Sequence, residues 1–184
     1  HSYHFDMTVR FTFLYLLPYL LFGQTFEVSK ASKITYYGSH YAHDWQGHSS
    51  VISGRILYDA DDQTANSCSL RVDLVTFNSG VSNRDSNMLT NLDAFQYPDV
   101  MFVSNEISVE GMNASIKGQL TFHGITKDIN LTADISVTDG FKAEGSFTIL
   151  LSDYEVERPA LLFKKIGDEM KLKFHIVAKL ILPQ

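Results

Sequence analysis

The feature that most constrains this chain is a strict alternation of apolar and polar residues between Asp128 and Val137. Every second side chain from Ile129 onward is apolar, whereas the residues between them are Asp, Asn, Thr, Asp and Ser. Successive side chains of a β-strand point to opposite faces of its sheet, so a period of two predicts a strand. Such a strand, buried on one face and solvated on the other, is typical of an antiparallel sheet that covers a hydrophobic core.

The same alternation recurs along most of the chain. It occupies residues 52–58, 68–74, 116–122, 143–151 and 172–180. Gly124 joins two of the alternating runs, which predicts a β-hairpin at that point. One stretch differs: residues 82–94 carry apolar side chains at helical spacing and predict a short helix that Pro98 ends. No repeat or linker divides the chain, so we expect one domain.

About eight strands of this kind fit either a β-sandwich or a closed barrel. Closure removes the exposed sheet edges, and eight strands enclose an interior that holds packed side chains or one slender ligand. Several positions on the predicted inner face are small: Gly54, Cys68, Gly118, Ala133, Ala143, Gly145 and Ala178. These residues either leave a lumen open or fit the taper of a packed core, and periodicity does not separate the two interpretations.

Charge and cysteine content exclude several classes of function. The formal net charge is −6, whereas nucleic-acid-binding proteins usually carry a basic surface, so we expect no nucleic-acid partner. The overall charge also provides no attraction to an anionic membrane. The single cysteine, Cys68, excludes an intrachain disulfide and cysteine-rich zinc sites, and we interpret it as a small core residue.

The first residues have the pattern of an export signal. Arg10 precedes an uncharged, largely apolar run over residues 11–22, and Gly23 offers a small residue for cleavage. Pro18 interrupts the run, which is shorter than the roughly 20 residues of a comfortable membrane span. We therefore expect residues 1–23 to contain a signal peptide, and residues 24–184 to form an exported, periplasmic or secreted domain without a stable membrane span.

The usual catalytic signatures, such as phosphate-binding glycine loops, a nucleophile elbow or a zinc-binding H-E-x-x-H, do not occur in the sequence. His40, His43 and Asp44 have a spacing that resembles a metal site. In an extended strand, however, His40 and His43 point to opposite faces, so we interpret this cluster as a polar strand end beside Trp45. We expect no enzymatic activity, metal or cofactor, and a metal-dependent enzyme using these three residues stays as a minor alternative.

Three segments, in this order along the chain, resemble the YceI-like family of exported, polyisoprenoid-binding proteins. The first is His43-Asp44-Trp45-Gln46-Gly47, which is similar to one branch of that family. The second covers residues 77–85, with Ser-Gly and Arg-Asp, and continues through Met88-Leu89 to Tyr97-Pro98. The third covers residues 118–127 and reads G-Q-L-T-F-H-G-I-T-K. The resemblance extends over about residues 26–180, and the chain departs from it at Asn87, where many relatives carry His.

The resemblance implies an all-β fold: an extended, lipocalin-like, antiparallel eight-stranded barrel with one short helix near residues 82–94. It implies that a long apolar channel binds an isoprenoid quinone, a polyprenyl compound or a similar lipid for transport, storage or sequestration outside the cytoplasm. A closed-core interaction module without lipid is the main alternative, and a homodimer is left open. The residues expected to bind the ligand face inward or lie at the barrel mouth: Trp45, Ile52, Ile56, Leu70, Val72, Arg84, Tyr97, Phe102, Leu120, Phe122, Phe147, Ile149, Phe163 and Phe174.

Overall fold

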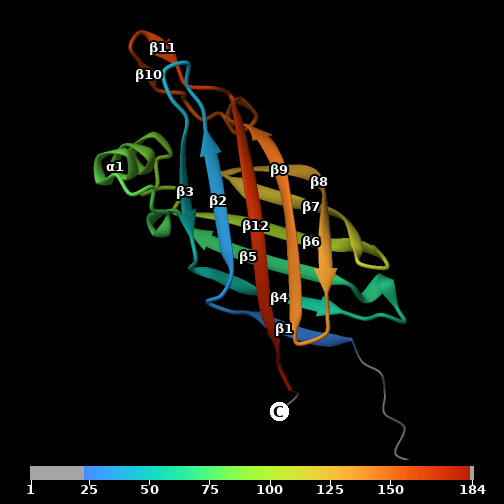
Figure 1. Cartoon of the computed structure of the whole chain (residues 1–184). Helices are drawn as coiled ribbons and strands as arrows, with labels where there is room; N and C mark the ends of the chain where they lie inside the picture. Colours follow the sequence, from blue (N-terminus) through green and yellow to red (C-terminus); the bar gives the residue numbers. More distant parts are fainter. Residues whose placement is uncertain (1–22, 183–184) are drawn as a thin grey trace, which may run out of the picture.

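A computed structural model of the chain describes residues 23–182, and it consists mainly of antiparallel strands that close into a barrel (Figure 1). The predicted signal peptide thus lies almost wholly outside the described residues. The strands of the barrel are β1 (Gln24–Val28), β2 (Lys33–Gly38), β3 (Trp45–Ser49), β4 (Ile52–Tyr58), β5 (Ser67–Asp73), β6 (Asp99–Glu110), β7 (Asn113–Phe122), β8 (Ile125–Ser136), β9 (Phe141–Leu150) and β12 (Glu169–Leu180). A separate two-stranded hairpin consists of β10 (Ala160–Leu161) and β11 (Lys164–Lys165), and the α-helix of the described chain is α1 (Ser82–Asn91).

Closure of the barrel depends on β12, which pairs with β9 on one side and with both β1 and β2 on the other. The strands β3 and β4 pair in turn with β2 and β1. The segments β1–β2 and β3–β4 therefore act as two bent strands, which together with β5 to β9 and β12 occupy eight positions around the ring. This arrangement confirms the predicted eight-stranded antiparallel barrel.

The alternation in the sequence decides which side chains face the interior. On β8, Ala133 and Ile135 are buried while Asp134 and Ser136 are exposed, as the period of two predicts. Buried residues form two clusters. One includes Phe26, Ile135 and Phe141 and lies near β1, and the other includes Leu92 and Phe122 and lies at the end that carries α1. The core is thus the inner face of the barrel wall rather than a layer between two sheets.

The helix α1 covers one end of the barrel and ends earlier than the sequence suggested. Asp85 holds its start, because both carboxylate oxygens accept the backbone N–H of Ser79, at 3.0 and 3.2 Å. The last helical residue is Asn91, after which Asp93 adopts a left-handed conformation with φ of 45°. The helix therefore stops within the turn that buries Leu92, and Pro98 is not the residue that ends it. Within residues 23–182, no helix has the length and apolar character needed to cross a lipid bilayer.

Two buried hydroxyl groups differ in how well they are satisfied. Ser104 sits at a bulge in β6, where its hydroxyl donates to the Lys117 carbonyl and accepts the N–H of Glu106 at 3.2 Å. The Tyr154 hydroxyl is buried and has no hydrogen-bond partner among the described residues. Because an unpaired buried polar group is costly whereas a paired one is not, removal of the two hydroxyls should have opposite effects on stability.

We expect Tyr154→Phe to leave the free energy of unfolding unchanged or to raise it by about 1 kcal/mol. Ser104→Ala should lower it by roughly 1–3 kcal/mol, because the substitution leaves the N–H of Glu106 without its acceptor. Urea unfolding of the two variants beside the parent chain measures both effects. A loss in Tyr154→Phe as large as that in Ser104→Ala would show that the tyrosine hydroxyl is satisfied in solution.

Candidate ligand-binding channel

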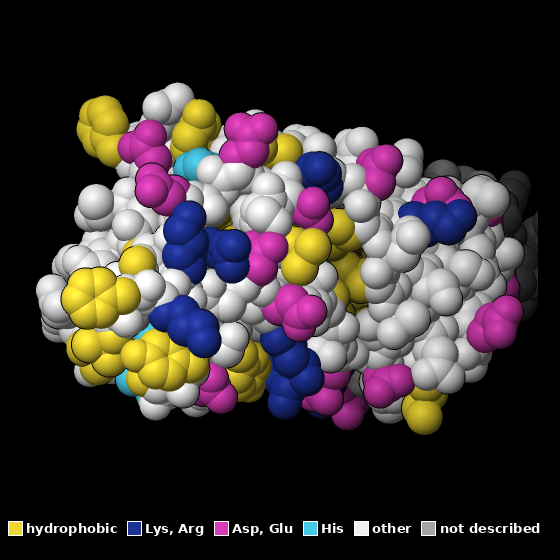
Figure 2. Space-filling model, turned by 90° about the horizontal axis from the view of Figure 1, so that it is seen from above, with side chains coloured by type: hydrophobic (Ala, Val, Ile, Leu, Met, Phe, Trp, Pro, Cys, Tyr) yellow, Lys and Arg dark blue, Asp and Glu magenta, His cyan; other side chains and the backbone are white. Residues whose placement is uncertain are grey.

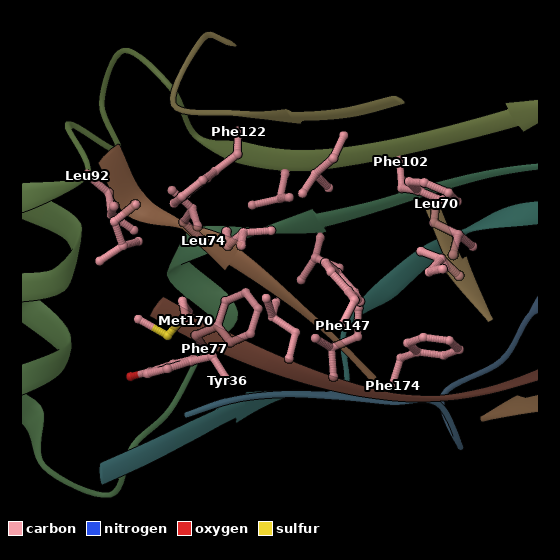
Figure 3. A pocket seen from close by; sticks show the side chains of 18 of the residues that line it. Tyr36, Leu70, Leu74, Phe77, Leu92, Phe102, Phe122, Phe147, Met170 and Phe174 are labelled. Carbon is pink, nitrogen blue, oxygen red and sulfur yellow. The ribbon is translucent and has the colours of Figure 1, made fainter. Parts of the chain in front are cut away.

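The barrel encloses an elongated cavity of about 710 Å³. Figure 3 shows Leu92, Phe77 and Tyr36 close to α1, with Phe102, Leu70 and Phe174 farther along the same space. Most of the lining side chains are aliphatic or aromatic, and they come from most strands of the barrel. Of the two interpretations that periodicity left open, the structure therefore supports an open lumen rather than a fully packed core.

Glycine residues keep this lumen open by receiving aromatic rings from neighbouring strands. A Cβ atom placed on Gly118 would lie 2.5 Å from a ring carbon of Phe102, and one placed on Gly145 would lie 2.5 Å from a ring carbon of Phe174. Each ring therefore lies against the backbone of the wall instead of projecting across the channel. The small inner residues thus act indirectly, because they make room for rings rather than for the ligand.

The hairpin of β2 and β3 contains two further pairs of this kind. Trp45 is opposite Gly38 and covers it, and Tyr36 is opposite Gly47 and covers it, so that a Cβ atom on either glycine would collide with the ring above it. Both rings are on the inner face and line the channel. The Trp-x-Gly spacing of residues 45–47 follows from this packing, since one residue supplies a ring and the other leaves space for one.

Polar side chains gather where the channel meets α1. Asn83, Asn87 and Asn91 lie four residues apart, so they share one face of the helix, and all three line the cavity. Arg84 lines it as well, is half-buried, and has neither an ion pair nor a hydrogen bond within residues 23–182. His43 and Glu157 also line this end of the channel, which we call the mouth.

Tyr36 lies between the apolar lumen and the charges of the mouth. Burial raises the pKa of its hydroxyl above the usual value, nearby Asp85 raises it further, and Arg84 lowers it. Figure 3 shows the hydroxyl oxygen directed toward α1 while the ring lies along the cavity. Tyr36 therefore stays a neutral donor and acceptor at neutral pH, in reach of the polar end of a bound molecule.

At the opposite end of the channel, the polar side chain in the lining is hydrogen-bonded to the protein backbone. Asn66 is buried, its side-chain oxygen accepts the N–H of Asp59 at 2.8 Å, and its amide donates to the carbonyl of Ile107. Phe141 packs there against Phe26 and Tyr58, with ring centroids 5.6 and 6.1 Å apart. The two ends of the channel are therefore chemically different, and polar groups without partners are found at the mouth.

The structure brings most of the predicted ligand-binding residues together around the cavity. The residues that line it are Trp45, Ile56, Leu70, Val72, Arg84, Phe102, Leu120, Phe122, Phe147, Ile149 and Phe174. Three predicted residues are not in the lining: Ile52 is buried in the wall, Tyr97 packs on His123 and Gly124, and Phe163 is exposed at the tip between β10 and β11. Their roles in ligand contact have no geometric support from the cavity.

Sequence reasoning also missed parts of the lining. Met170 and Leu172 on β12 line the cavity. The predicted alternating run begins at Leu172, and Met170 extends the same period by one step toward the start of the strand. The asparagine series on α1 was visible as a four-residue spacing, but only the position of the helix shows that it faces the mouth. The alternation of the strand before it does not reveal that His123 is half-buried, with Nδ1 2.8 Å from the Tyr154 carbonyl.

The histidine cluster near β3 has local hydrogen-bonding roles. Nδ1 of His40 accepts the N–H of Ala42 at 3.3 Å, which leaves the ring proton on Nε2 to donate to the Lys164 carbonyl at 3.1 Å. Both ring nitrogens of this buried residue are thus in use. In the described part of the chain, no group of three or more His, Cys, Asp or Glu side chains has an arrangement that could hold a metal ion.

Cys68 faces the cavity, and burial raises the pKa of its thiol from an ordinary value of 9.0 to about 11. At pH 8 the native thiol should therefore react with iodoacetamide about a hundredfold more slowly than in the unfolded chain, because the thiolate is the reactive form. Mass spectrometry of the alkylated protein, with a urea-unfolded control, measures the ratio. Equal rates in both states would contradict burial of Cys68 in the channel wall.

Comparison with known proteins agrees with this geometry. The sequence matches the YceI-like domain family over residues 27–178. A UPF0312 protein of Pectobacterium carotovorum is 25% identical over 129 residues, which cover 64% of this chain and 66%, just under two thirds, of the relative.

Two solved structures share the fold. One is BcnA of Burkholderia cenocepacia, with a TM-score of 0.75, 22% identity, and coverage of 83% of this chain and 99% of that chain. The other is described as a polyisoprenoid binding domain from Saccharophagus degradans implicated in plant cell wall breakdown, with a TM-score of 0.69, 16% identity, and coverage of 86% and 99%. The family match spans nearly the whole barrel, and the chain therefore belongs to the YceI-like domain family.

Proposed function

We propose that this protein binds one long apolar amphiphile, such as an isoprenoid quinone or a polyprenyl compound, inside the barrel. The observation that carries the proposal is an apolar cavity of about 710 Å³ whose unpartnered polar groups are concentrated at one end. Ligand cavities in proteins commonly measure about 300–1,000 Å³ and are mostly apolar, with a few polar groups that fix orientation. A closed-core interaction module would have no use for such a space.

Burial of the apolar tail supplies the affinity. Each CH₂ group moved from water into the channel contributes about 0.8 kcal/mol, so a chain of many carbons binds without any covalent chemistry. The walls are formed by hydrogen-bonded strands and by rings held against glycine residues, so little of the channel must reorganise on binding. The eleven predicted residues in the lining are those we assign to tail contact or, for Trp45 and Arg84, to the mouth.

The mouth is suited to the polar head of the same molecule. Arg84 offers a guanidinium group that has no protein partner in the described structure, and Asn83, Asn87 and Asn91 offer carboxamides that both donate and accept. A head group with carbonyl, hydroxyl or phosphate oxygens would satisfy these groups. An entirely apolar molecule would leave them to water, which favours an amphiphile with its head at α1.

The proposed role is transport, storage or sequestration outside the cytoplasm. Its support is the signal-like segment over residues 1–23 together with the fold shared with a domain described as polyisoprenoid binding. Mass spectrometry of an organic extract from natively purified protein tests the class of ligand. An isoprenoid or other long-chain amphiphile near one molecule per chain supports the carrier, and a protein that is empty and takes up no isoprenoid quinone refutes it.

Leu131→Trp should lower uptake of an isoprenoid quinone at least about tenfold, because Leu131 faces the lumen and an indole would occupy the path of the tail. Thr132→Trp is the matched control, since the adjacent side chain on β8 is exposed on the outer face. Absorbance of quinone retained after gel filtration measures uptake by both variants. Equal loss in both, or in neither, would mean that the tail does not occupy the channel.

Arg84→Gln should weaken binding of an anionic amphiphile such as a polyprenyl phosphate by roughly tenfold, because it removes a charge-assisted hydrogen bond. Binding of the matching uncharged polyprenol should change little. Quenching or enhancement of Trp45 fluorescence follows both titrations, since this residue is the single tryptophan and lines the cavity. If the variant binds both compounds as the parent chain does, Arg84 has no contact with the head group.

A further inference from the structure

The hairpin of β10 and β11 exposes apolar side chains that the barrel does not use. Phe163 is 106% exposed and Leu162 is 63% exposed, and both adopt left-handed backbone conformations, with φ of 65° and 51°. Such conformations cost free energy for residues other than Gly, Asn or Asp, and a fully exposed phenylalanine gains nothing from burial. The folded protein therefore presents two large apolar side chains at a strained turn.

Basic and aromatic residues surround this apolar tip. Lys164 and Lys165 follow it directly and are exposed, and Nζ of Lys164 lies 5.1 Å from the ring centroid of Tyr41, which is itself 62% exposed. Figure 1 shows the hairpin projecting beyond the end of the barrel. Figure 2, which views that end from above, shows Lys and Arg side chains beside exposed hydrophobic ones.

The base of the hairpin is fixed to the barrel beside the channel mouth. Ile166 donates its N–H to the Pro159 carbonyl at 3.1 Å, and Gly167 donates to the Ser39 carbonyl at 2.8 Å. The His40 ring holds the Lys164 carbonyl. Because Pro159, Ala160 and Ile166 also line the cavity, the tip lies next to the opening.

We propose that this tip docks the mouth of the barrel onto a phospholipid bilayer that contains anionic lipids. Phe163 and Leu162 would insert among the acyl chains near the interface, Tyr41 would lie at the level of the head groups, and Lys164 and Lys165 would bind lipid phosphates. Membrane docking is a property separate from filling of the lumen. Docking would let an amphiphile pass between bilayer and channel without crossing water. This purpose of docking rests on the proposed function.

The net charge of −6 does not oppose this local attraction. At physiological ionic strength each charge acts over about 8 Å, so the two lysines of a projecting tip meet the lipid phosphates before more distant carboxylates do. Asp44 and Glu157 are exposed at the same end, which keeps the attraction modest and makes the apolar contact necessary. A combination of two weak signals, one apolar and one basic, is typical of reversible membrane association.

The experiment uses residues 24–184, which contain the whole barrel, because the apolar run over residues 11–22 would itself bind vesicles. It compares binding to vesicles of phosphatidylcholine with phosphatidylglycerol and to vesicles of phosphatidylcholine alone. Phe163→Ser should weaken binding to the anionic vesicles roughly tenfold or more. Lys164→Gln combined with Lys165→Gln should weaken it by about fivefold for each lysine and reduce its sensitivity to salt. Phe95→Ser is the matched control, because Phe95 is 102% exposed and, unlike Phe163, is not followed by lysines in the sequence.

A second measurement detects insertion directly. In vesicles with brominated acyl chains, Phe163→Trp should show quenched emission relative to the Trp45 signal of the parent chain, and Phe95→Trp should not. The double lysine variant should still take up isoprenoid quinone in detergent, so a failure of docking is distinguishable from a failure of lumen binding.

Three outcomes would overturn the proposal: vesicle binding by Phe163→Ser equal to that of the parent, an unquenched Phe163→Trp, or no preference for anionic vesicles. Light scattering adds a fourth test. If the parent chain is a dimer that Phe163→Ser dissociates, the tip is a contact between two copies and not a membrane anchor.

Discussion

The pairing of β12 with both β1 and β2 is the interaction on which the rest of this structure depends. It joins the last strand of the barrel to the first two, with Phe26 opposite Leu180 and Ile34 opposite Phe174. Without it, β12 and β1 would be free edges, and free edges pair with other chains. The inner apolar face would also open to water, so the channel exists only because these distant segments meet.

Once the barrel is closed, the arrangement of aromatic rings and glycine residues decides what it contains. Four rings, those of Tyr36, Trp45, Phe102 and Phe174, lie over glycine residues of neighbouring strands. A side chain on any of these glycine residues would push a ring into the lumen. The bulkiest residues of the inner face thus form flat walls, which explains how a barrel rich in aromatic residues retains a cavity of about 710 Å³.

Arg84 and Asp85, which are adjacent at the mouth, have different roles. The Asp85 carboxylate accepts the backbone N–H of Ser79 and so fixes the loop before α1. Arg84 has no partner in the described structure and lines the cavity. The helix contains no fully buried residue, and it is held by this loop, by the partly buried Met88 and Leu89, and by Leu92, which follows it. It therefore acts as a polar rim of the channel rather than as part of the core.

Local pattern alone determined a large part of this protein. Side-chain direction along a strand is a property of adjacent residues, so the alternation near Asp128 and the turn at Gly124 predicted strands, faces and a hairpin that the structure contains. The first strands, β1 to β3, are short and include Gly38 and Gly47, and their pattern is too weak to delimit them individually. The motif around Trp45 indicates the family, although the sequence does not show how the Trp45 ring packs.

Only the tertiary structure decided between an open lumen and a packed core. That choice depends on which ring covers which glycine across a pair of strands, and on the closure that β12 provides, and both join residues far apart in the chain. The same limit applies to Phe163, because phenylalanine is usually buried in a core but here lies at an exposed tip. A sequence pattern specifies the direction of a side chain relative to its own strand, whereas its surroundings depend on where distant strands are placed.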